Sequence, residues 1–344
     1  MIQSVKGNLL EDSAEAYVNT VNTVGVMGKG IALQFKQAFP DVFDQYVKDC
    51  KKGLVQIGVM HVAEVQGLAA PKYVINFPTK EHWRHPSKLE YIQKGLIDLV
   101  KVVRNLEIKS IALPPLGCGN GGLEWSEVRP LILEAFQPLK VEVHLYEPAG
   151  APPLDKMIVR TKKPKMTMGR ALLLAAMSRY AGPGYRMSLL EVQKIAYFLY
   201  EIGALPKLKY EKGKFGPYAD NLNHVLQAMQ GHYIRGYGDR TQGAEIYLLD
   251  GAAEEAEQFL STDDEAKSYL QQVADLIYGF ETPYDLELLS TVGWILKEEP
   301  TKVDNKHFVV EAVMNWNERK KRIFPEDHIM QVWDYLVHEV NFTW

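Results

Sequence analysis

The hydrophobic and polar positions in the first half of the chain follow two alternating periods. Short apolar, β-branched runs predict strands, and apolar residues spaced three and four apart predict helices. The expected strands are 2–6, 15–19, 59–65, 73–77, 108–113 and 141–146. The expected helices are 31–38, 42–50, 89–105 and 124–136. Strands alternating with helices predict an α/β fold of three layers, α/β/α, with a mixed or largely parallel sheet covered on both faces.

The second half of the chain has a mainly helical pattern. The expected helices are 168–179, 188–202, 219–229, 254–278, 284–296, 308–316 and 328–340, and the less regular stretch 231–249 predicts a hairpin. The intervening residues are rich in proline and lysine and have no apolar period, which is typical of a linker. We therefore expect a domain at 1–148, a linker at 149–167 and a mainly α domain at 168–344.

Two glycine-rich loops stand out in the first half. One spans 19–30 and the other 114–122; each follows an apolar run and leads into a helical pattern. Glycines let backbone N–H groups approach an anion, and a helix start adds a favourable dipole. Neither the dinucleotide GxGxxG spacing nor a Walker A sequence is present. Two such loops in one domain suit a diphosphate-linked ligand held between them.

Charge and cysteine content narrow the class of protein. Residues 156–170 hold six basic residues and no acid, while residues 171–344 hold 17 basic and 26 acidic residues. An acidic domain suits a basic protein partner, although solubility alone explains many acidic domains. The two cysteines, Cys50 and Cys118, lack a metal or disulfide pattern and suit a reducing cytoplasm. Cys118 is expected to be a packed residue, and we expect a cytoplasmic protein without metal or cofactor.

Three segments, Lys6–Leu10, the Asn22 loop and Gly117–Gly122, resemble the macrodomain family, which binds ADP-ribose, over about residues 1–148. Asn8 stands where many members have an aspartate that holds the adenine amine, so that contact is expected to be weaker or made by the amide oxygen. The resemblance implies the following ADP-ribose contacts: Gly7, Asn8, Leu9, Asn19, Asn22, Gly28, Gly30, Ile31, Thr79, Leu116, Gly117, Cys118, Gly119, Asn120, Gly121, Gly122 and Leu123.

Within this family the chain resembles the branch that removes ADP-ribose by means of a lysine. The matching residue is Lys80, directly after an expected strand, with Asn22 orienting the ribose. A neutral amine could attack the anomeric carbon or its ring-opened carbonyl form, which requires a lowered pKa from burial or from a nearby cation such as Arg84 or His82. His82 and Trp83 are also candidates for stacking a base.

The second loop departs from the lysine-dependent branch in one respect. The human member carries an aspartate there as a partner to the lysine, whereas residues 119–122 contain no acid. Glu124, His82 or a water molecule are therefore the candidates for the proton donor.

Over its whole length the chain resembles the DarG-type antitoxin family. The resemblance implies hydrolysis of ADP-ribose from thymidine in single-stranded DNA, with ADP-ribose as the product. Residues 189–200 and 214–218 resemble a Panacea-type antitoxin domain, which would bind and block a cognate DarT-like toxin, a DNA ADP-ribosyltransferase. We expect a monomer or a 1:1 heterodimer with the toxin. The alternatives are a non-catalytic ADP-ribose reader and a hydrolase acting on ADP-ribosylated protein carboxylates or O-acetyl-ADP-ribose.

Overall fold

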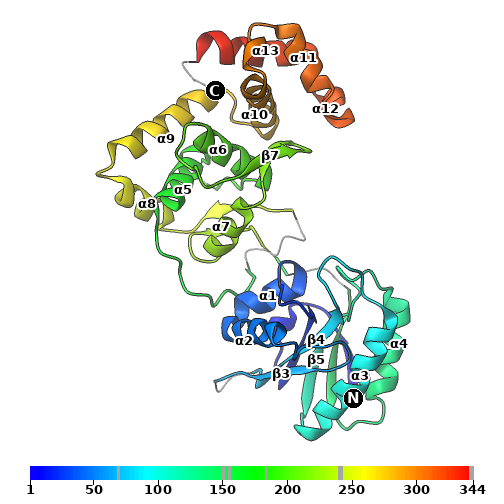
Figure 1. The fold of residues 1–344 in the computed structure, drawn as a ribbon. Coiled ribbons are helices and arrows are strands. Elements are labelled where there is room, and N and C mark those ends of the chain that lie inside the picture. Colours follow the sequence, from blue (N-terminus) through cyan, green and yellow to red (C-terminus); the bar gives the residue numbers. More distant parts are fainter. Residues whose placement is uncertain (68–69, 149–151, 154–155, 183, 239–242, 341–344) are drawn as a thin grey trace. The chain divides into compact units, whose positions relative to one another are not determined.

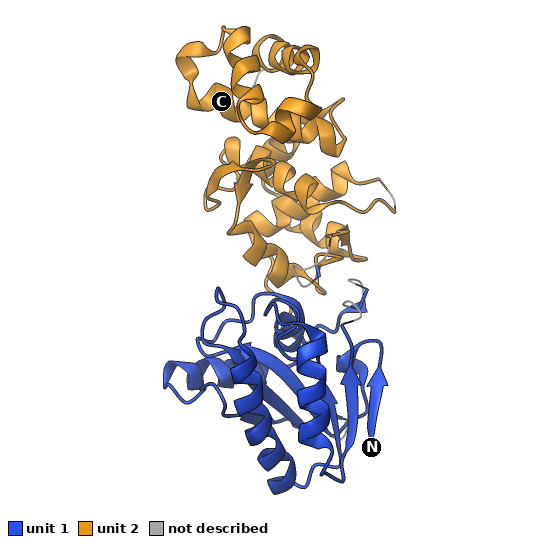
Figure 2. Ribbon diagram, turned by 90° about the vertical axis from the view of Figure 1, so that its right-hand side faces the viewer, with its two compact units in different colours: residues 1–162, 238–242 blue, residues 163–237, 243–344 orange. Residues whose placement is uncertain are grey.

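The computed structural model describes residues 1–67, 70–148, 152–153, 156–182, 184–238 and 243–340. The chain divides into two compact units (Figure 2). Unit 1 comprises Met1–Lys162 and Gly238–Gln242, and unit 2 comprises Lys163–Tyr237 and Gly243–Trp344. The division at Lys162/Lys163 falls inside the stretch expected to be a linker. Each unit has hydrophobic clusters of its own.

Unit 1 is built on a six-stranded sheet in the order β1-β6-β5-β2-β4-β3 (Figure 1). Its strands are β1 (Ile2–Val5), β2 (Ala16–Asn22), β3 (His61–Glu64), β4 (Tyr73–Lys80), β5 (Ser110–Leu113) and β6 (Glu142–Tyr146). All neighbouring pairs are parallel except β3 with β4, which is antiparallel. The sheet is therefore mixed, as the alternating pattern predicts.

Helices cover both faces of this sheet. The helical elements are η1 (Leu9–Glu11), α1 (Gly30–Ala38), α2 (Pro40–Lys51), α3 (Leu89–Asn105) and α4 (Trp125–Phe136). Apolar residues of α3 and α4 pack with one set of strand residues, and those of η1, α1 and α2 pack with the alternate set. Side chains alternate between the two faces of a strand, so each strand supplies both cores. The three-layer α/β/α fold is confirmed.

Two strands extend farther than their apolar runs predict. β2 continues from the expected end at Asn19 to Asn22, and β4 continues from Phe77 to Lys80. The polar ends of both strands remain in the ladder because Asn22 pairs with Lys80, with a register shift after Val21. Backbone hydrogen bonds do not depend on side-chain polarity, so both functional candidates lie at strand ends rather than in loops.

A close helix–strand contact fixes β4 against α3. Gly95 of α3 lies against the ring of Phe77, and a Cβ atom at Gly95 would approach the Phe77 Cζ atom to 2.2 Å. A glycine in the middle of a helix is ordinarily unfavourable by about 0.5–1 kcal/mol relative to alanine. Here the glycine allows the ring of Phe77 to pack closely, which positions the strand that ends at Lys80.

Unit 2 is largely helical, with two short hairpins, β7–β8 and β9–β10. Helices α6 and α10 are buried along most of their length and α10 contacts both α6 and β8. The elements are α5 (Met168–Tyr180), α6 (Leu189–Glu201), β7 (Tyr210–Gly213), β8 (Gly216–Ala219), α7 (Leu222–Met229), β9 (Ile234–Arg235), β10 (Tyr247–Leu248), α8 (Ala252–Leu260), α9 (Asp264–Ile277), α10 (Pro283–Glu298), η3 (Pro300–Lys302), α11 (Lys306–Met314), α12 (Glu318–Ile323), α13 (Glu326–Asp334) and the π-helical η4 (Tyr335–Glu339).

Unit 2 departs from the expected elements at several places: the expected helix 328–340 is divided into α13 and the π-helical η4, and the expected helix 219–229 begins only at Leu222. The predicted helix 254–278 is two helices, α8 and α9, because Asp263 caps the second through a hydrogen bond from the Ala266 amide. The hairpin β7–β8 and the short helix α12 show no apolar period, so the sequence pattern did not predict them. Within the described residues no helix combines the length and apolarity needed to cross a membrane.

Candidate active site

Three adjacent strands bring the candidate residues to one edge of the unit 1 sheet. β2 lies between β5 and β4 and runs parallel to both, so the three strands end at the same edge. The first glycine loop follows β2, the second follows β5, and Lys80 is the last residue of β4. The carboxyl edge of an open α/β sheet is where such folds bind ligands.

Lys80 lies between the two loops. Its backbone carbonyl accepts a hydrogen bond from the Thr23 amide at 3.1 Å, which ties it to the first loop. Its amine donates to the carbonyl of Asn120, which brings it to the second loop. Burial lowers the pKa of the Lys80 amine below its ordinary value of 10.5. The neutral, nucleophilic form of the amine is therefore favoured relative to that of an exposed lysine.

Asn22 shapes the first loop from within. Its side-chain oxygen accepts hydrogen bonds from the Val24 and Val26 amides at 3.1 and 3.2 Å, and its Nδ2 donates to the Val26 carbonyl. The Tyr46 hydroxyl of α2 donates to the Asn22 backbone carbonyl at 2.5 Å. Both polar atoms of the Asn22 carboxamide are thus bonded to the backbone of the loop, and these hydrogen bonds hold the loop in its bend.

The second loop is a close-packed turn. The Leu123 amide donates to the Gly117 carbonyl and the Gly122 amide to the Gly119 carbonyl, each at 3.1 Å. A Cβ atom at Gly121 would lie 2.1 Å from the Gly117 oxygen and 2.4 Å from the Ser87 hydroxyl oxygen. Gly121 is therefore required by the packing of the turn, and the loop is a defined structure rather than a flexible connection.

Both loops offer unoccupied backbone donors. Among the described residues, the amides of Gly28, Gly119 and Asn120 have no hydrogen-bond partner. The helices that follow the loops, α1 and α4, both begin without a side-chain cap. The first amides of an uncapped helix point outward and favour an anion. Two such starts at one sheet edge match the two phosphates of a diphosphate.

Several predicted contact residues lie inside the protein. Leu9, Leu116 and Thr79 are buried, and the Thr79 hydroxyl faces the Val21 carbonyl at 3.4 Å. Asn19 is fully buried; its Nδ2 donates to Asn76 Oδ1 at 2.9 Å. None of these side chains is open to solvent, so their part is to pack in the interior of the unit.

Asn8 caps η1 in a way that the sequence did not indicate. Its Oδ1 accepts from the Leu10 amide at 3.1 Å, while its buried Nδ2 has no partner among the described atoms. The group left for a ligand is thus a donor, whereas the adenine contact was expected to be weaker or made by the amide oxygen. Gly7, Gly30 and Gly122 have positive φ angles, which glycine adopts without strain.

The remaining predicted contacts, Ile31, Cys118 and Leu123, are partly buried around the loops. The Leu123 side chain packs on Gly117, which fixes the end of the second turn. Burial raises the pKa of the Cys118 thiol to about 11, and its Sγ donates to the Leu116 carbonyl at 3.5 Å. Cys118 therefore stays a neutral thiol, in agreement with the interpretation that it is a packed residue and not a nucleophile.

The segment after Lys80 presents a stack of aromatic and cationic side chains. The rings of His82 and Trp83 stack with centroids 5.4 Å apart, and the Arg84 guanidinium lies 4.6 Å from the Trp83 ring centre. His85 lies 5.2 Å from His82, and Trp83 is 46% exposed. None of these side chains has a described contact with Lys80, nor has Glu124, so burial is the cause of the Lys80 pKa shift.

Two supporting residues were missed by sequence reasoning. Ser87 donates its amide to the Gly121 carbonyl at 2.9 Å, and its buried hydroxyl has no partner among the described atoms. Tyr46 holds the first loop from α2. Segment 80–87 is tied to the second loop at both ends, by Lys80 through the Asn120 carbonyl and by Ser87 through the Gly121 carbonyl. Tyr46 could have been suspected from its place on the apolar face of α2; Ser87 carries no signal in the sequence.

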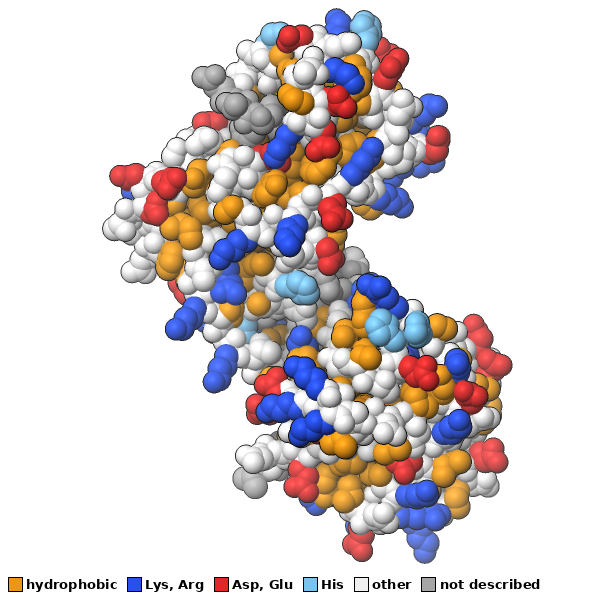
Figure 3. Space-filling view, in the orientation of Figure 1, with side chains coloured by type: hydrophobic (Ala, Val, Ile, Leu, Met, Phe, Trp, Pro, Cys, Tyr) orange, Lys and Arg blue, Asp and Glu red, His pale blue; other side chains and the backbone are white. Residues whose placement is uncertain are grey.

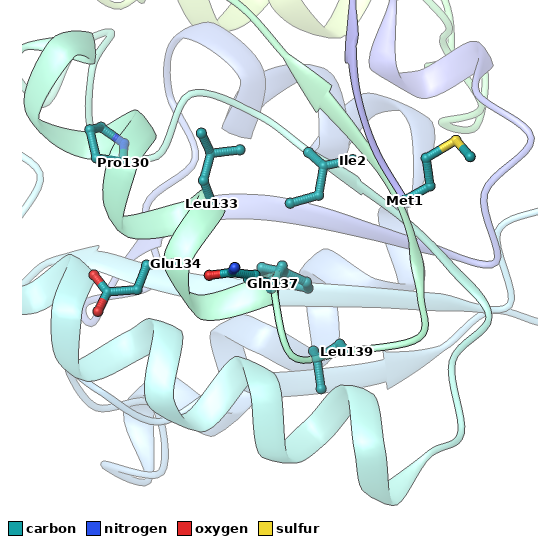
Figure 4. Close-up of a pocket in the computed structure, with 8 residues that line it drawn as sticks. Met1, Ile2, Pro130, Leu133, Glu134, Gln137 and Leu139 are labelled. Atoms are coloured by element: carbon teal, nitrogen blue, oxygen red, sulfur yellow. The ribbon is translucent and has the colours of Figure 1, made fainter.

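An open depression elsewhere in unit 1 lacks such groups. It has a volume of about 560 Å³ and lies between the start of β1 and the end of α4 (Figure 4). Its lining is mainly apolar, with Glu134 and Gln137 as its polar side chains. None of the predicted site residues lines it. The sheet edge at Lys80 is therefore the place where chemical groups converge.

Comparisons with known proteins agree with this geometry. The family model described as Macro domain matches residues 18–132. A DNA ADP-ribosyl glycohydrolase of Thermus aquaticus is 48% identical over 338 residues, covering 98% of this chain and 93% of that protein. One of Mycobacterium tuberculosis is 42% identical, covering 96% and 97%. A DNA ADP-ribosyl transferase–DNA ADP-ribosyl glycohydrolase fusion protein of Thermosipho africanus is 35% identical, covering 42% of this chain and 41% of the fusion.

Two of these relatives match nearly the full length of both chains, across both units. The macrodomain match lies within unit 1, where the two glycine loops and Lys80 meet. The chain therefore belongs to the DNA ADP-ribosyl glycohydrolase family, a family of hydrolases whose first unit is a macrodomain.

Proposed function

We propose that unit 1 hydrolyses the N-glycosidic bond between ADP-ribose and thymine in single-stranded DNA. The observation that carries the proposal is the position of the Lys80 amine, which is partly desolvated and hydrogen-bonded to the second glycine loop. The free amides of both loops and the uncapped starts of α1 and α4 supply donors for the two phosphates. A diphosphate held there would bring the attached ribose to Lys80.

The chemistry requires one covalent intermediate. The neutral amine of Lys80 attacks the anomeric carbon of the ribose and forms a C–N bond; loss of a proton from the bound amine and opening of the sugar ring then give a Schiff base. The bond to thymine breaks, and its electron pair goes to the base nitrogen, which takes up a proton. Water then releases ADP-ribose and restores the amine. Lys80 is the proposed catalytic residue, and Asn22 acts through the shape of the first loop.

The exposed aromatic stack offers a place for the DNA. Trp83, backed by His82, is accessible and follows Lys80 by three residues. Stacking of a base on an aromatic ring contributes about 1–3 kcal/mol, and the Arg84 guanidinium beside the ring supplies a cation for a phosphate. We therefore assign the thymine or a neighbouring base to this stack.

The second unit is proposed to bind and block the toxin that attaches ADP-ribose to DNA. Residues 171–344 carry 26 acidic and 17 basic residues, so this part of the chain complements a basic DNA-binding surface. The fusion of a transferase with a glycohydrolase in the Thermosipho africanus relative supports such a partnership. Full-length Lys80→Ala protein should still inhibit the transferase, and increasing salt should weaken its binding. Absence of any association at low ionic strength would contradict this part.

The catalytic proposal is tested with Lys80→Ala and an oligonucleotide carrying ADP-ribosyl thymidine. We expect release of ADP-ribose to slow on the order of 10³-fold, because the nucleophile is removed. Reduction with cyanoborohydride during turnover should trap ADP-ribose on Lys80, as detected by peptide mass. Lys101→Ala, an exposed lysine of α3, is the matched control. A normal rate for folded Lys80→Ala would exclude the lysine mechanism and leave an ADP-ribose reader or a different hydrolase.

A further inference from the structure

Unit 2 contains a basic surface that its overall charge conceals. Segments 207–214 and 319–322 hold eight of the 17 Lys and Arg residues of 171–344, and the two segments include one acid, Glu211. The rest of 171–344 has nine basic and 25 acidic residues. On the side of unit 2 where β7 and α12 lie in Figure 1, Figure 3 shows Lys and Arg side chains with Asp and Glu side chains among them. Of these eight, Lys320 is buried and pairs with Glu287, whereas Lys212, Lys214 and Arg319 line a common hollow.

The two segments meet at the tip of the β7–β8 hairpin. An open hollow of about 550 Å³ lies there, between the hairpin and the start of α12. Lys212, Lys214 and Arg319 contribute to its lining, with Glu318 as the single carboxylate. Arg319 is paired with Glu287 at 2.6 Å. Lys212 and Lys214 have no carboxylate partner among the described residues, so two cations remain available to a ligand.

An exposed aromatic ring accompanies these cations. Phe215 stands at the two-residue turn of the hairpin and is 43% exposed. The Arg319 guanidinium lies 4.6 Å and the Lys214 amine 5.4 Å from its ring centre. The Lys212 amine lies 4.4 Å from the ring centre of Trp316. Trp316 is buried, so Phe215 is the accessible ring of the pair. Cations beside an accessible ring are the combination that binds a nucleic-acid strand, through phosphate contacts and base stacking.

The tip is held rigidly although it is exposed. Trp316 Nε1 donates to the Gly213 carbonyl at 2.8 Å, and Asn317 Nδ2 donates to the Lys214 carbonyl at 2.9 Å. On the inner side, Gly216 has a φ of +92°, and a Cβ atom there would lie 2.9 Å from the buried amine of Lys194. The backbone that carries Phe215 is therefore preorganised, which lowers the entropic cost of binding a ligand at this turn.

We propose that this hairpin tip is a second nucleic-acid site, which takes single-stranded DNA with phosphates at Lys212 and Lys214 and a base against Phe215. An acidic protein would satisfy the lysines, but it would not explain the exposed phenyl ring on a turn whose backbone is held. The site lies outside the unit 1 macrodomain and does not use Lys80.

The experiment measures binding of the full chain to a fluorescent, unmodified oligothymidylate of about 12 nucleotides. Phe215→Ala should weaken binding by about 5- to 150-fold, the effect of losing one stacked base. Lys212→Ser with Lys214→Ser should lower the slope of log K against log salt by about 0.7 for each lost phosphate contact. The control is Lys267→Ser with Tyr278→Ala, a surface lysine and a 79% exposed tyrosine of the same unit.

Thermal unfolding of each variant verifies that unit 2 remains folded. The proposal is overturned if the hairpin variants bind the oligonucleotide as the control does, because the strand would then be held elsewhere. It is also overturned if poly-glutamate binds as tightly as the oligonucleotide and Phe215→Ala affects neither, because the surface would then take acidic proteins. Since the DNA is unmodified, these results do not depend on whether unit 1 cleaves ADP-ribose.

Discussion

Burial lowers the pKa of lysines in both units, but with different consequences. In unit 1, Lys80 ends a strand beside two loops with free amides, and its amine contacts a single backbone carbonyl. In unit 2, Lys194 and Lys320 are almost fully buried, and burial lowers the pKa of Lys320 to about 8. The Lys320 amine is held by Glu287 and Thr291, and the Lys194 amine by the Pro217 carbonyl.

The comparison teaches that a depressed pKa does not by itself identify a reactive lysine. The buried amines of unit 2 have their hydrogen bonds within the protein, and the two side chains are 2% and 0% exposed, so neither is open to a ligand. Lys80 is less buried, but it lies where a ligand would arrive. Reactivity requires both an uncharged amine and an open approach to it.

The largest effect is expected from breaking the ion cluster of unit 2. Glu287→Gln removes the carboxylate that pairs with Arg319 and Lys320, leaving two cations without a counter-charge, and should destabilise unit 2 by about 3–5 kcal/mol. Hydrogen exchange followed by mass spectrometry should show that the backbone amides of unit 2 lose protection, while those of unit 1 keep theirs. Glu298→Gln, on the exposed end of the same helix α10, is the control. Equal protection in both variants would mean that the cluster is not structural.

A smaller effect is expected in the second loop of unit 1. Gly121→Ala places a methyl group against the Gly117 carbonyl and Ser87, so the turn must shift away from Lys80. Because a displacement of about 1 Å costs on the order of 10²-fold in rate, ADP-ribose release should fall by about that factor. Gly119→Ala has open space around its added methyl and keeps the turn. The packing argument fails if both variants lose the same activity.

The pH dependence of the rate distinguishes Lys80 from an ordinary lysine. Protonation blocks the amine, so kcat should rise about tenfold per pH unit and level off as pH passes the Lys80 pKa. Burial lowers that pKa, so the plateau should begin below pH 10.5. Residual activity of Lys80→Ala should lack this rise. A rate independent of pH across this range, with chemistry limiting, would argue against a titrating amine.

The periodic elements of unit 1 could be predicted because its strands and helices bury regular apolar faces. The strand ends could not, since Asn22 and Lys80 are polar and the backbone ladder continues through them. The glycine loops were singled out by their residue types, whereas Lys80 was assigned only by the resemblance to the lysine-dependent branch, since a lysine by itself is ordinarily a surface residue. Ser87 belongs to no motif in the sequence, and only the folded chain brings it against Gly121. The β7–β8 hairpin was missed because its four-residue strands are too short and polar to show an alternation.

The smallest effect is expected from the contact that supports the first loop. Tyr46→Phe removes the hydroxyl that donates to the Asn22 carbonyl, which should destabilise unit 1 by about 1 kcal/mol. Since Asn22 bends the loop through its own side chain, the loop should loosen and KM should rise severalfold, while kcat changes less. Tyr91→Phe, on α3 at the opposite face of the sheet, is the control for losing a tyrosine hydroxyl. If Tyr46→Phe lowers kcat and leaves KM unchanged, the α2 contact acts on Lys80 rather than on the grip of the first loop.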